Sequence, residues 1–231
     1  DVEGTSGKGM VTARTNDGWG MYGMAGEDNR EGVKIMALKG GSNNNLAQQD
    51  IIDAINYARN NGADILKMSF GSPTNSSPAE LSAIRAAYNA GIVLIAGSGS
   101  SGSQGVWYPA ALKEVIAVGA TTHVAQRLST SDYSAFLLAL SAPGQGILST
   151  VPGDAYTNSG GTSMATPMVS GTAALMQCVN PCLSPLQFND IFRESIDRVG
   201  GYNYGKVNSL ILPPYDDVSE ELGHGRLDAE K

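Results

Sequence analysis

The sequence predicts an α/β protein whose single, mostly parallel sheet is doubly wound, with helices covering both faces. Continuous apolar runs at 92–96, 115–118 and 136–141 are typical of strands that are buried on both faces, as parallel strands are. Between such runs, apolar residues recur at helical spacing, so strands alternate with helices. This alternation implies right-handed crossovers and predicts three layers, with the sheet between two layers of helices.

The first half of the chain supplies two strands and two helices in this scheme. Val33–Leu38 is a short apolar run and is expected to form a strand. The helix after it is stopped by Gly62, and Ala63–Ser69 forms the next strand. A second helix ends before Gly91. The apolar faces of these helices are formed by Ile51, Ile52, Ile55 and Ala58 in the first and by Leu81, Ile84 and Tyr88 in the second.

Two more helices are expected in the last third of the chain. One begins at Thr162 and continues through small residues that allow close packing against the sheet. Pro167 lies in its first turns, where a missing N–H costs little. The other runs from Ser184 to Ile196, with a serine cap and Pro185 at the first helical position.

Length and composition fit one domain, residues 1–231. Charged residues are 16% and glycines number 29, which suits a compact, loop-rich fold with tight turns. The net charge of -7 and the lack of a basic run with aromatic residues argue against nucleic acid as a partner. No stretch approaches 18 apolar residues, so neither a membrane span nor a signal peptide is expected in this chain. Cys178 and Cys182 form either a short-loop disulfide or two unpaired thiols.

The most informative motif is the octet Gly160–Pro167, which places small residues on both sides of Ser163. Two glycines let the backbone turn sharply and let a substrate approach closely. The N–H groups of the first helical turn then offer partial positive charge to an oxyanion. A serine in this setting is a candidate nucleophile.

The octet closely resembles the nucleophile motif of the subtilisin-like serine proteases, and further segments match the family in its order over nearly the whole chain. The resemblance implies a subtilisin-type three-layer fold and peptide-bond hydrolysis by an endopeptidase. The matching segments are Gly62–Gly71, Gly91–Ser100, Tyr108–Ala110, Val115–Thr122, Leu140–Gly144 and Gly223–Ala229.

The resemblance also implies roles for individual residues. Ser163 is the expected nucleophile, and Ser100 stands at the oxyanion position, where the family has asparagine. Two segments are expected to bind an extended peptide or protein substrate as neighbouring strands. These substrate-binding residues are Ser69, Phe70 and Gly71 in the first segment and Gly97, Ser98 and Gly99 in the second.

A serine hydroxyl needs a base to take its proton, and the chain lacks the family's histidine motif. The two histidines, His123 and His224, lie elsewhere in the sequence. Aligning Gly4-Thr5 with the motif's Gly-Thr places Glu3 at the histidine position, and a second register, which fits less well, places Thr5 there. A carboxylate with an ordinary pKa is too weak a base for a serine hydroxyl, unless burial raises the pKa of Glu3 strongly.

The catalytic aspartate of the family precedes the histidine on an earlier strand, which resemblance places between the strands matching Val33–Leu38 and Ala63–Ser69. We therefore expect a peptidase domain that lacks its N-terminal strands. Either the two flanking strands pair directly, or they leave unpaired parallel edges that expose apolar side chains and invite self-association.

The resulting prediction is a subtilisin-like endopeptidase domain that is inactive or severely impaired as this chain. Alternatively, the chain is a pseudoprotease that keeps the cleft as a peptide-binding module, or a remnant without a binding role. No cofactor and no metal site are expected from the residues, although the family resemblance leaves calcium open. The resemblance also implies an extracellular, secreted protein.

Overall fold

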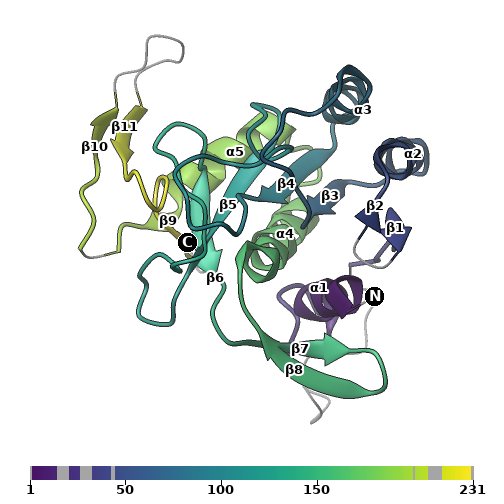
Figure 1. Ribbon diagram of the computed structural model, residues 1–231, viewed down its shortest axis with the longest axis horizontal. Helices are drawn as coiled ribbons and strands as arrows, with labels where there is room; N and C mark the ends of the chain where they lie inside the picture. The colour runs from purple at the N-terminus through teal and green to yellow at the C-terminus, as the bar shows by residue number, and fades with distance from the viewer. Residues whose placement is uncertain are drawn as a thin grey trace.

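The structure, a computed structural model, describes residues 2–14, 21–26, 33–42, 45–199, 201–207 and 215–229, and its centre is a six-stranded sheet (Figure 1). The four strands at one side of the sheet are parallel and in sequence order, β12 is parallel to β6, and β9 at the far edge is antiparallel to β12. The predicted mostly parallel sheet is thereby confirmed. In spatial order the strands are β3 (Ile65–Met68), β4 (Val93–Gly97), β5 (Ile116–Thr121), β6 (Leu140–Pro143), β12 (Arg226–Leu227) and β9 (Ile196–Asp197).

Helices cover both faces of this sheet. On one face, α4 (Thr162–Val179) and α5 (Pro185–Glu194) pack against the central strands. On the other face lie α2 (Gln48–Asn60) and α3 (Pro78–Asn89). The result is the expected arrangement of helix, sheet and helix.

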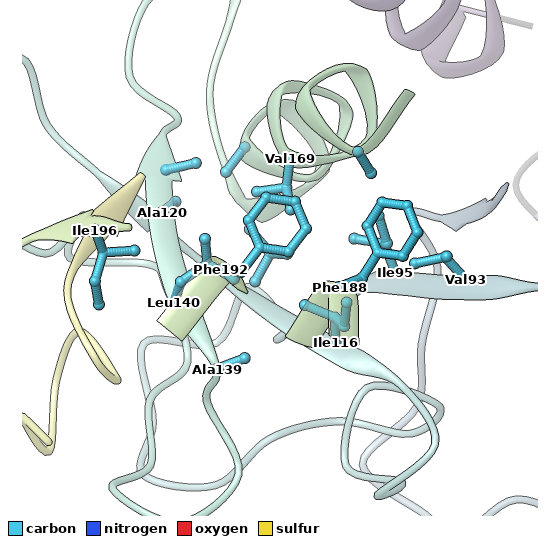
Figure 2. Packing of buried hydrophobic residues seen from close by; sticks show 14 residues of the cluster. Val93, Ile95, Ile116, Ala120, Ala139, Leu140, Val169, Phe188, Phe192 and Ile196 are labelled. Atoms are coloured by element: carbon cyan, nitrogen blue, oxygen red, sulfur yellow. The ribbon is translucent and has the colours of Figure 1, made fainter. Parts of the chain in front are cut away.

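The two cores follow from the alternation of side chains along buried strands. In β4, Val93 and Ile95 point into the core under α4 and α5, whereas Leu94 and Ala96 point into the core under α3. Figure 2 shows the first core, in which the rings of Phe188 and Phe192 lie between α4 and the sheet. Both rings are at most 1% exposed, so they contribute strongly to stability.

Local sequence determines where several helices begin. The hydroxyl of Ser77 accepts a hydrogen bond from the backbone N–H of Glu80, and Pro78 occupies the first helical position of α3. Ser184 and Gln187 form a capping box at the start of α5, again followed by proline at the first position. The start at Ser184-Pro185 was predicted from the sequence and is confirmed, whereas the start of α3 at Ser77-Pro78 was not predicted.

The predicted strand at Val33–Leu38 is wrong. Residues 33–40 form no strand, and β3 pairs with β4 alone among the described strands. Ile35 and Met36 are each 39% exposed. Apolar composition does not make a strand without a neighbour for its backbone groups, and the direct pairing that we considered does not form.

The predicted strand at Phe136–Ser141 is partly wrong, because β6 begins only at Leu140. Phe136 and Leu137 lie in a turn and are 43% and 40% exposed. The hydroxyl of Ser134 accepts a hydrogen bond from the N–H of Phe136, which stabilises the turn.

The N-terminal helix α1 (Val2–Thr12) was not predicted as a helix, and it packs against α4 and β7. The strands β7 (Ile147–Val151) and β8 (Ala155–Ser159) form a hairpin that binds this helix. Ser149 Oγ donates to the carbonyl of Ser6 at 2.7 Å, and Thr150 Oγ1 donates to the carbonyl of Thr5 at 3.1 Å. A glycine-rich helix therefore depends on tertiary contacts. Two small antiparallel pairs complete the described fold, β1 (Gly41–Ser42) with β2 (Asn45–Leu46) and β10 (Gly205–Val207) with β11 (Tyr215–Val218).

Candidate active site

Ser163 is the second residue of α4 and is half-buried. The residue before the helix, Gly161, has φ +124°, a conformation that L side chains rarely adopt. Its N–H donates to the carbonyl of Gly144 at 2.8 Å, which fixes the turn against the end of β6. In the first turn, the N–H groups of Met164 and Ala165 donate to the carbonyl of Gly161 at 3.1 and 3.3 Å. The helix start therefore presents the N–H groups of Thr162 and Ser163 beside the serine side chain.

The Ser163 side chain faces the carboxyl end of β3. Its Oγ donates to the carbonyl of Ser69 at 3.5 Å, and Ser69 Oγ donates to the carbonyl of Ser163 at 3.4 Å. These are long contacts, so the hydroxyl is only loosely held. The helix start and the first predicted substrate segment are nevertheless adjacent.

Ser100 lies on the loop after β4, on the other side of the helix start. Ser100 Oγ is 3.4 Å from Thr162 Oγ1, which in turn donates to the carbonyl of Gly99 at 3.2 Å. A methyl group built on Gly161 would lie 3.8 Å from Ser100 Oγ and 4.0 Å from Ser163 N. The Ser100 hydroxyl and the Ser163 N–H thus border the same small space, as two oxyanion donors would.

The two predicted substrate segments lie side by side at the ends of β3 and β4 and are joined by residues 107–108. Ser72 and Tyr108 exchange backbone hydrogen bonds of 2.9 Å, and the N–H of Trp107 donates to the carbonyl of Ser98 at 2.9 Å. A methyl group on Gly71 would lie 3.4 Å from Trp107 Cβ, and one on Gly99 would lie 2.8 Å from Trp107 Cγ. The Trp107 side chain therefore occupies the space between the segments.

The structure does not bring a histidine to this group. His123 is exposed, and its Nδ1 is 3.0 Å from Gln145 Oε1. The backbone N–H of His224 donates to the carbonyl of Ala139, the residue just before β6. Glu3 and Thr5 both lie in α1, beside α4. Thr5 is half-buried there, and the side chain of Glu3 is outside the described part of the chain.

Three residues that the sequence did not identify belong to this region. Thr162 connects Ser100 with Gly99, Trp107 separates the substrate segments, and Asp132 binds the loop after Gly99. Thr162 stands inside the serine motif and was within reach of motif reasoning. Trp107 lies further along the loop that follows β4, and Asp132 lies on the loop between β5 and β6. No local pattern shows that their side chains reach this region.

Other chemistry in the described residues is sparse. They contain no group of three or more His, Cys, Asp or Glu side chains that could hold a metal ion. Cys178 and Cys182 are both free thiols and exposed. Among the helices that the structure describes, none is long and apolar enough to cross a membrane.

A serine at the start of a helix, at the carboxyl ends of parallel strands, is a layout that serine proteases of the α/β class use. The match to a family model over residues 4–225 makes the assignment specific. The chain belongs to the subtilase family, Peptidase S8.

Individual relatives agree with this assignment. The chain is 37% identical over 210 residues to alkaline elastase YaB of Bacillus sp. (strain YaB), covering 89% of this chain and 53% of the elastase. It is 36% identical over 210 residues to Subtilisin Savinase of Lederbergia lenta, covering 89% of this chain and 75% of Savinase. The chain thus spans about half the length of the first relative.

Solved structures show the same fold. Sphericase superposes with a TM-score of 0.78 at 29% identity, covering 98% of this chain and 77% of Sphericase. The prenylagaramide maturation protease PagA gives a TM-score of 0.78 at 25% identity, covering 100% of this chain and 81% of PagA.

Proposed function

We propose that the chain is a subtilisin-like serine endopeptidase domain in which Ser163 is the nucleophile. The observation that carries this proposal is the meeting of Ser163, Ser100 and the Ser69 carbonyl at one end of the sheet. An extended peptide would lie along Ser69–Gly71 and Gly97–Gly99 as an added strand. The family assignment supports peptides or proteins as substrates. From the family resemblance we also propose that the protein acts outside the cell.

In this function, Ser163 Oγ attacks the carbonyl carbon of the substrate and the carbonyl oxygen becomes an oxyanion. The N–H of Ser163 and the hydroxyl of Ser100 would donate to that oxygen. In subtilisin itself, removal of the oxyanion side-chain donor costs about 10² to 10³ in turnover, and a serine hydroxyl is shorter than the asparagine it replaces. The attacking hydroxyl must also lose its proton.

No imidazole of the described residues contacts Ser163, so proton removal limits this chain. We propose that it turns over peptides poorly or not at all by itself. In subtilisin, loss of triad members leaves about 10³ to 10⁴ of rate enhancement over water, from the oxyanion hole and binding. A slow residual reaction at Ser163 is therefore expected.

We further propose that the sheet is completed by an acid-bearing strand from outside the described residues, as in a domain whose N-terminal part is missing. The outer edge of β3 supports this proposal, because no described segment pairs with it. In the family order this strand would lie between β3 and the segment 33–38, in which Ile35 and Met36 are exposed. Without such a strand, the same edge favours self-association.

Labelling with a peptidyl fluorophosphonate tests the proposal. We expect slow covalent labelling of the wild-type chain and none of Ser163→Ala, measured by intact-protein mass spectrometry. Binding of an extended peptide is measured on both proteins by calorimetry, and the substitution should leave it unchanged. Equal labelling of wild type and Ser163→Ala would overturn the role of Ser163.

A second function, a pseudoprotease that binds peptides without cleaving them, is favoured by one observation. Residues 107–108 bind Ser98 and Ser72 and so connect the two proposed substrate segments, although no histidine of the described residues contacts Ser163. Micromolar peptide binding without any labelling would support this function, and absence of both would leave a structural remnant.

The position of Trp107 predicts a preference for peptides with a small side chain at the substrate residue whose carbonyl carbon Ser163 would attack. Because the indole fills the space between Gly71 and Gly99, Trp107→Ala should raise the affinity for a peptide with Phe at that residue. We expect the affinity for the Phe-containing peptide, divided by the affinity for the same peptide with Ala at that residue, to rise by about tenfold or more. Tyr156→Ala, an exposed aromatic on β8, should leave the ratio of the two affinities unchanged. An unchanged ratio in Trp107→Ala would contradict this role.

A further inference from the structure

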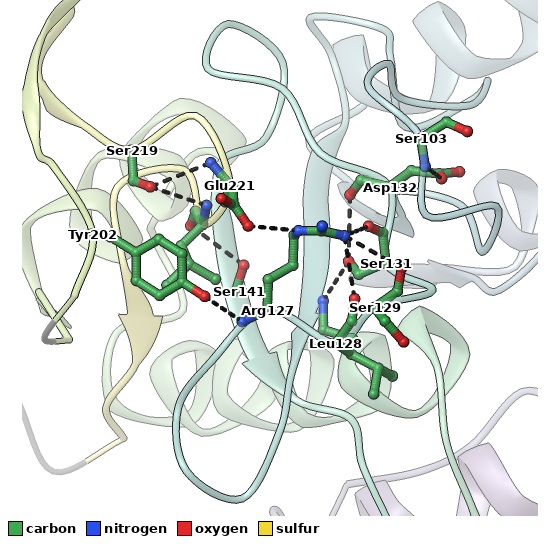
Figure 3. A network of polar contacts seen from close by, with 12 residues as sticks. Ser103, Arg127, Leu128, Ser129, Ser131, Asp132, Ser141, Tyr202, Ser219 and Glu221 are labelled. Carbon is green, nitrogen blue, oxygen red and sulfur yellow. Dashed lines mark hydrogen bonds and ion pairs between the residues drawn. The ribbon is translucent and has the colours of Figure 1, made fainter.

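Asp132 is a fully buried carboxylate that the proposed reaction does not use. It lies between β5 and β6 and is 0% exposed. Its Oδ1 accepts three hydrogen bonds, from Ser101 N at 3.0 Å, Ser101 Oγ at 2.6 Å and Ser103 N at 2.8 Å. Figure 3 shows the carboxylate turned toward the Ser103 backbone, across from the Arg127 network. A buried carboxylate with this many donors organises the loop that supplies them.

The backbone of Asp132 binds the same loop. Its N–H donates to the carbonyl of Gly99 at 3.2 Å, and its carbonyl accepts from Ser98 Oγ at 2.8 Å. Residues 98–103 are therefore held at their start, middle and end by one residue. Every one of these bonds joins segments about 30 positions apart, so local sequence cannot replace them.

The second carboxylate oxygen points at the turn itself. Asp132 Oδ2 has no hydrogen-bond partner among the described residues. It lies where a methyl group on Gly99 would point, so its nearest neighbour in that direction is the Gly99 Cα–H. This is the geometry of a weak Cα–H···O contact, and it leaves room for glycine alone.

The contacts continue from Asp132 into the candidate active site. The carbonyl of Gly99 accepts from Asp132 N and also from Thr162 Oγ1, the residue before Ser163. The next residue, Ser100, has its hydroxyl 3.4 Å from the same Thr162 Oγ1. Asp132 thus binds Ser98, Gly99 and Ser101, the residues on both sides of Ser100 at the oxyanion position.

We propose that Asp132 is a positioning residue that fixes the Gly99–Ser100 turn, so that the short Ser100 hydroxyl is held facing the N–H of Ser163. The proposal rests on the proposed function for the role of Ser100. It goes beyond that function because it assigns the positioning of the oxyanion donor Ser100 to a buried side chain that does not contact the substrate. A serine donor makes this precision more important, because its reach is shorter than that of asparagine.

The test compares Asp132→Ala, Asp132→Asn and Ser101→Ala with the wild-type chain. Asp132→Ala removes three hydrogen bonds and is expected to slow fluorophosphonate labelling by about tenfold or more, with peptide affinity changed less than about threefold. Asp132→Asn keeps an acceptor for the Ser101 and Ser103 amides and should stay within about threefold of wild type. Ser101→Ala removes one bond at an exposed position and is expected to fold and to show a smaller loss.

Ser131→Ala is the matched control. Ser131 is the buried neighbour of Asp132; its hydroxyl accepts from the N–H of Ala120 and donates to the backbone carbonyl of Asp132 at 3.3 Å, so the substitution keeps the hydrogen bonds of the Asp132 carboxylate. The substitution should lower stability by about 1 to 3 kcal/mol, as loss of a buried acceptor does, without slowing labelling. If Ser131→Ala and Asp132→Ala slow labelling equally, Asp132 has a structural role alone and the proposal fails.

Amide hydrogen exchange separates the proposal from the proposed function. Asp132→Ala should raise the exchange rates of the Ser101 and Ser103 amides relative to Asp132→Asn and to Ser131→Ala. If the wild-type chain neither labels nor binds peptides, the proposed function fails, while the exchange rates still decide whether Asp132 fixes the turn. Unchanged exchange at both amides in Asp132→Ala would overturn the positioning role.

Discussion

Gly99→Ala should destabilise the protein by about 3 kcal/mol or more and abolish labelling at Ser163. Two effects add. Gly99 has φ +118°, where an alanine is strained, and its methyl group would overlap Asp132 Oδ2 and lie 2.8 Å from Trp107 Cγ. Both neighbours are held in place, the carboxylate by three hydrogen bonds and the indole by its position between Gly71 and Gly99. Urea unfolding followed by circular dichroism measures the loss.

Gly105→Ala is the control that separates these two effects. Gly105 lies on the same loop and has φ +124°, but a methyl group there would meet no atom within 4 Å. It should therefore cost the backbone strain alone, about 1 to 2 kcal/mol, and should leave labelling intact. Equal losses in the two variants would show that the contacts of Gly99 with Asp132 and Trp107 do not matter.

Phe188→Ala is expected to cost about 3 to 5 kcal/mol of unfolding free energy. The ring is 0% exposed and lies between α5, α4 and the central strands (Figure 2). Removing the ring leaves a cavity in the core between α4, α5 and the sheet, because the surrounding helices and strands relax only in part. Such a loss is a large fraction of the stability of a single domain.

The control for this substitution lies on the same helix. Leu186 is 59% exposed, and Leu186→Ala should change the unfolding free energy by no more than about 0.5 kcal/mol. Phe188→Leu keeps part of the volume and is expected to fall between the two. A loss below about 1 kcal/mol in Phe188→Ala would contradict the assignment of Phe188 to the core.

The candidate site divides into parts that were predictable from sequence and parts that were not. Ser163 was identified because its setting is local, with Gly160 and Gly161 before it and a helix after it. Ser100 and the two expected substrate segments followed from the family resemblance; the structure places Ser69 against Ser163 and Ser100 against Thr162, and the roles of these residues stay predictions. Trp107 and Asp132 were missed because their importance comes from contacts with loops about 30 residues or more away, such as those with Gly71 and Ser101.

The sequence by itself determined the elements whose causes lie within a few residues or within a periodic pattern. The starts of α3 and α5 are set by Ser77-Pro78 and Ser184-Pro185, and the buried strand β4 by its unbroken apolar run. Tertiary structure alone decided whether an apolar segment became a strand. Residues 33–38 have the composition of a strand but are not part of any strand that the structure describes, whereas the glycine-rich α1 is a helix that packs on α4 and the β7–β8 hairpin. The physical reason is that backbone groups of a strand are satisfied only by another segment of the fold, and a weak helix is stabilised mainly by what it packs against.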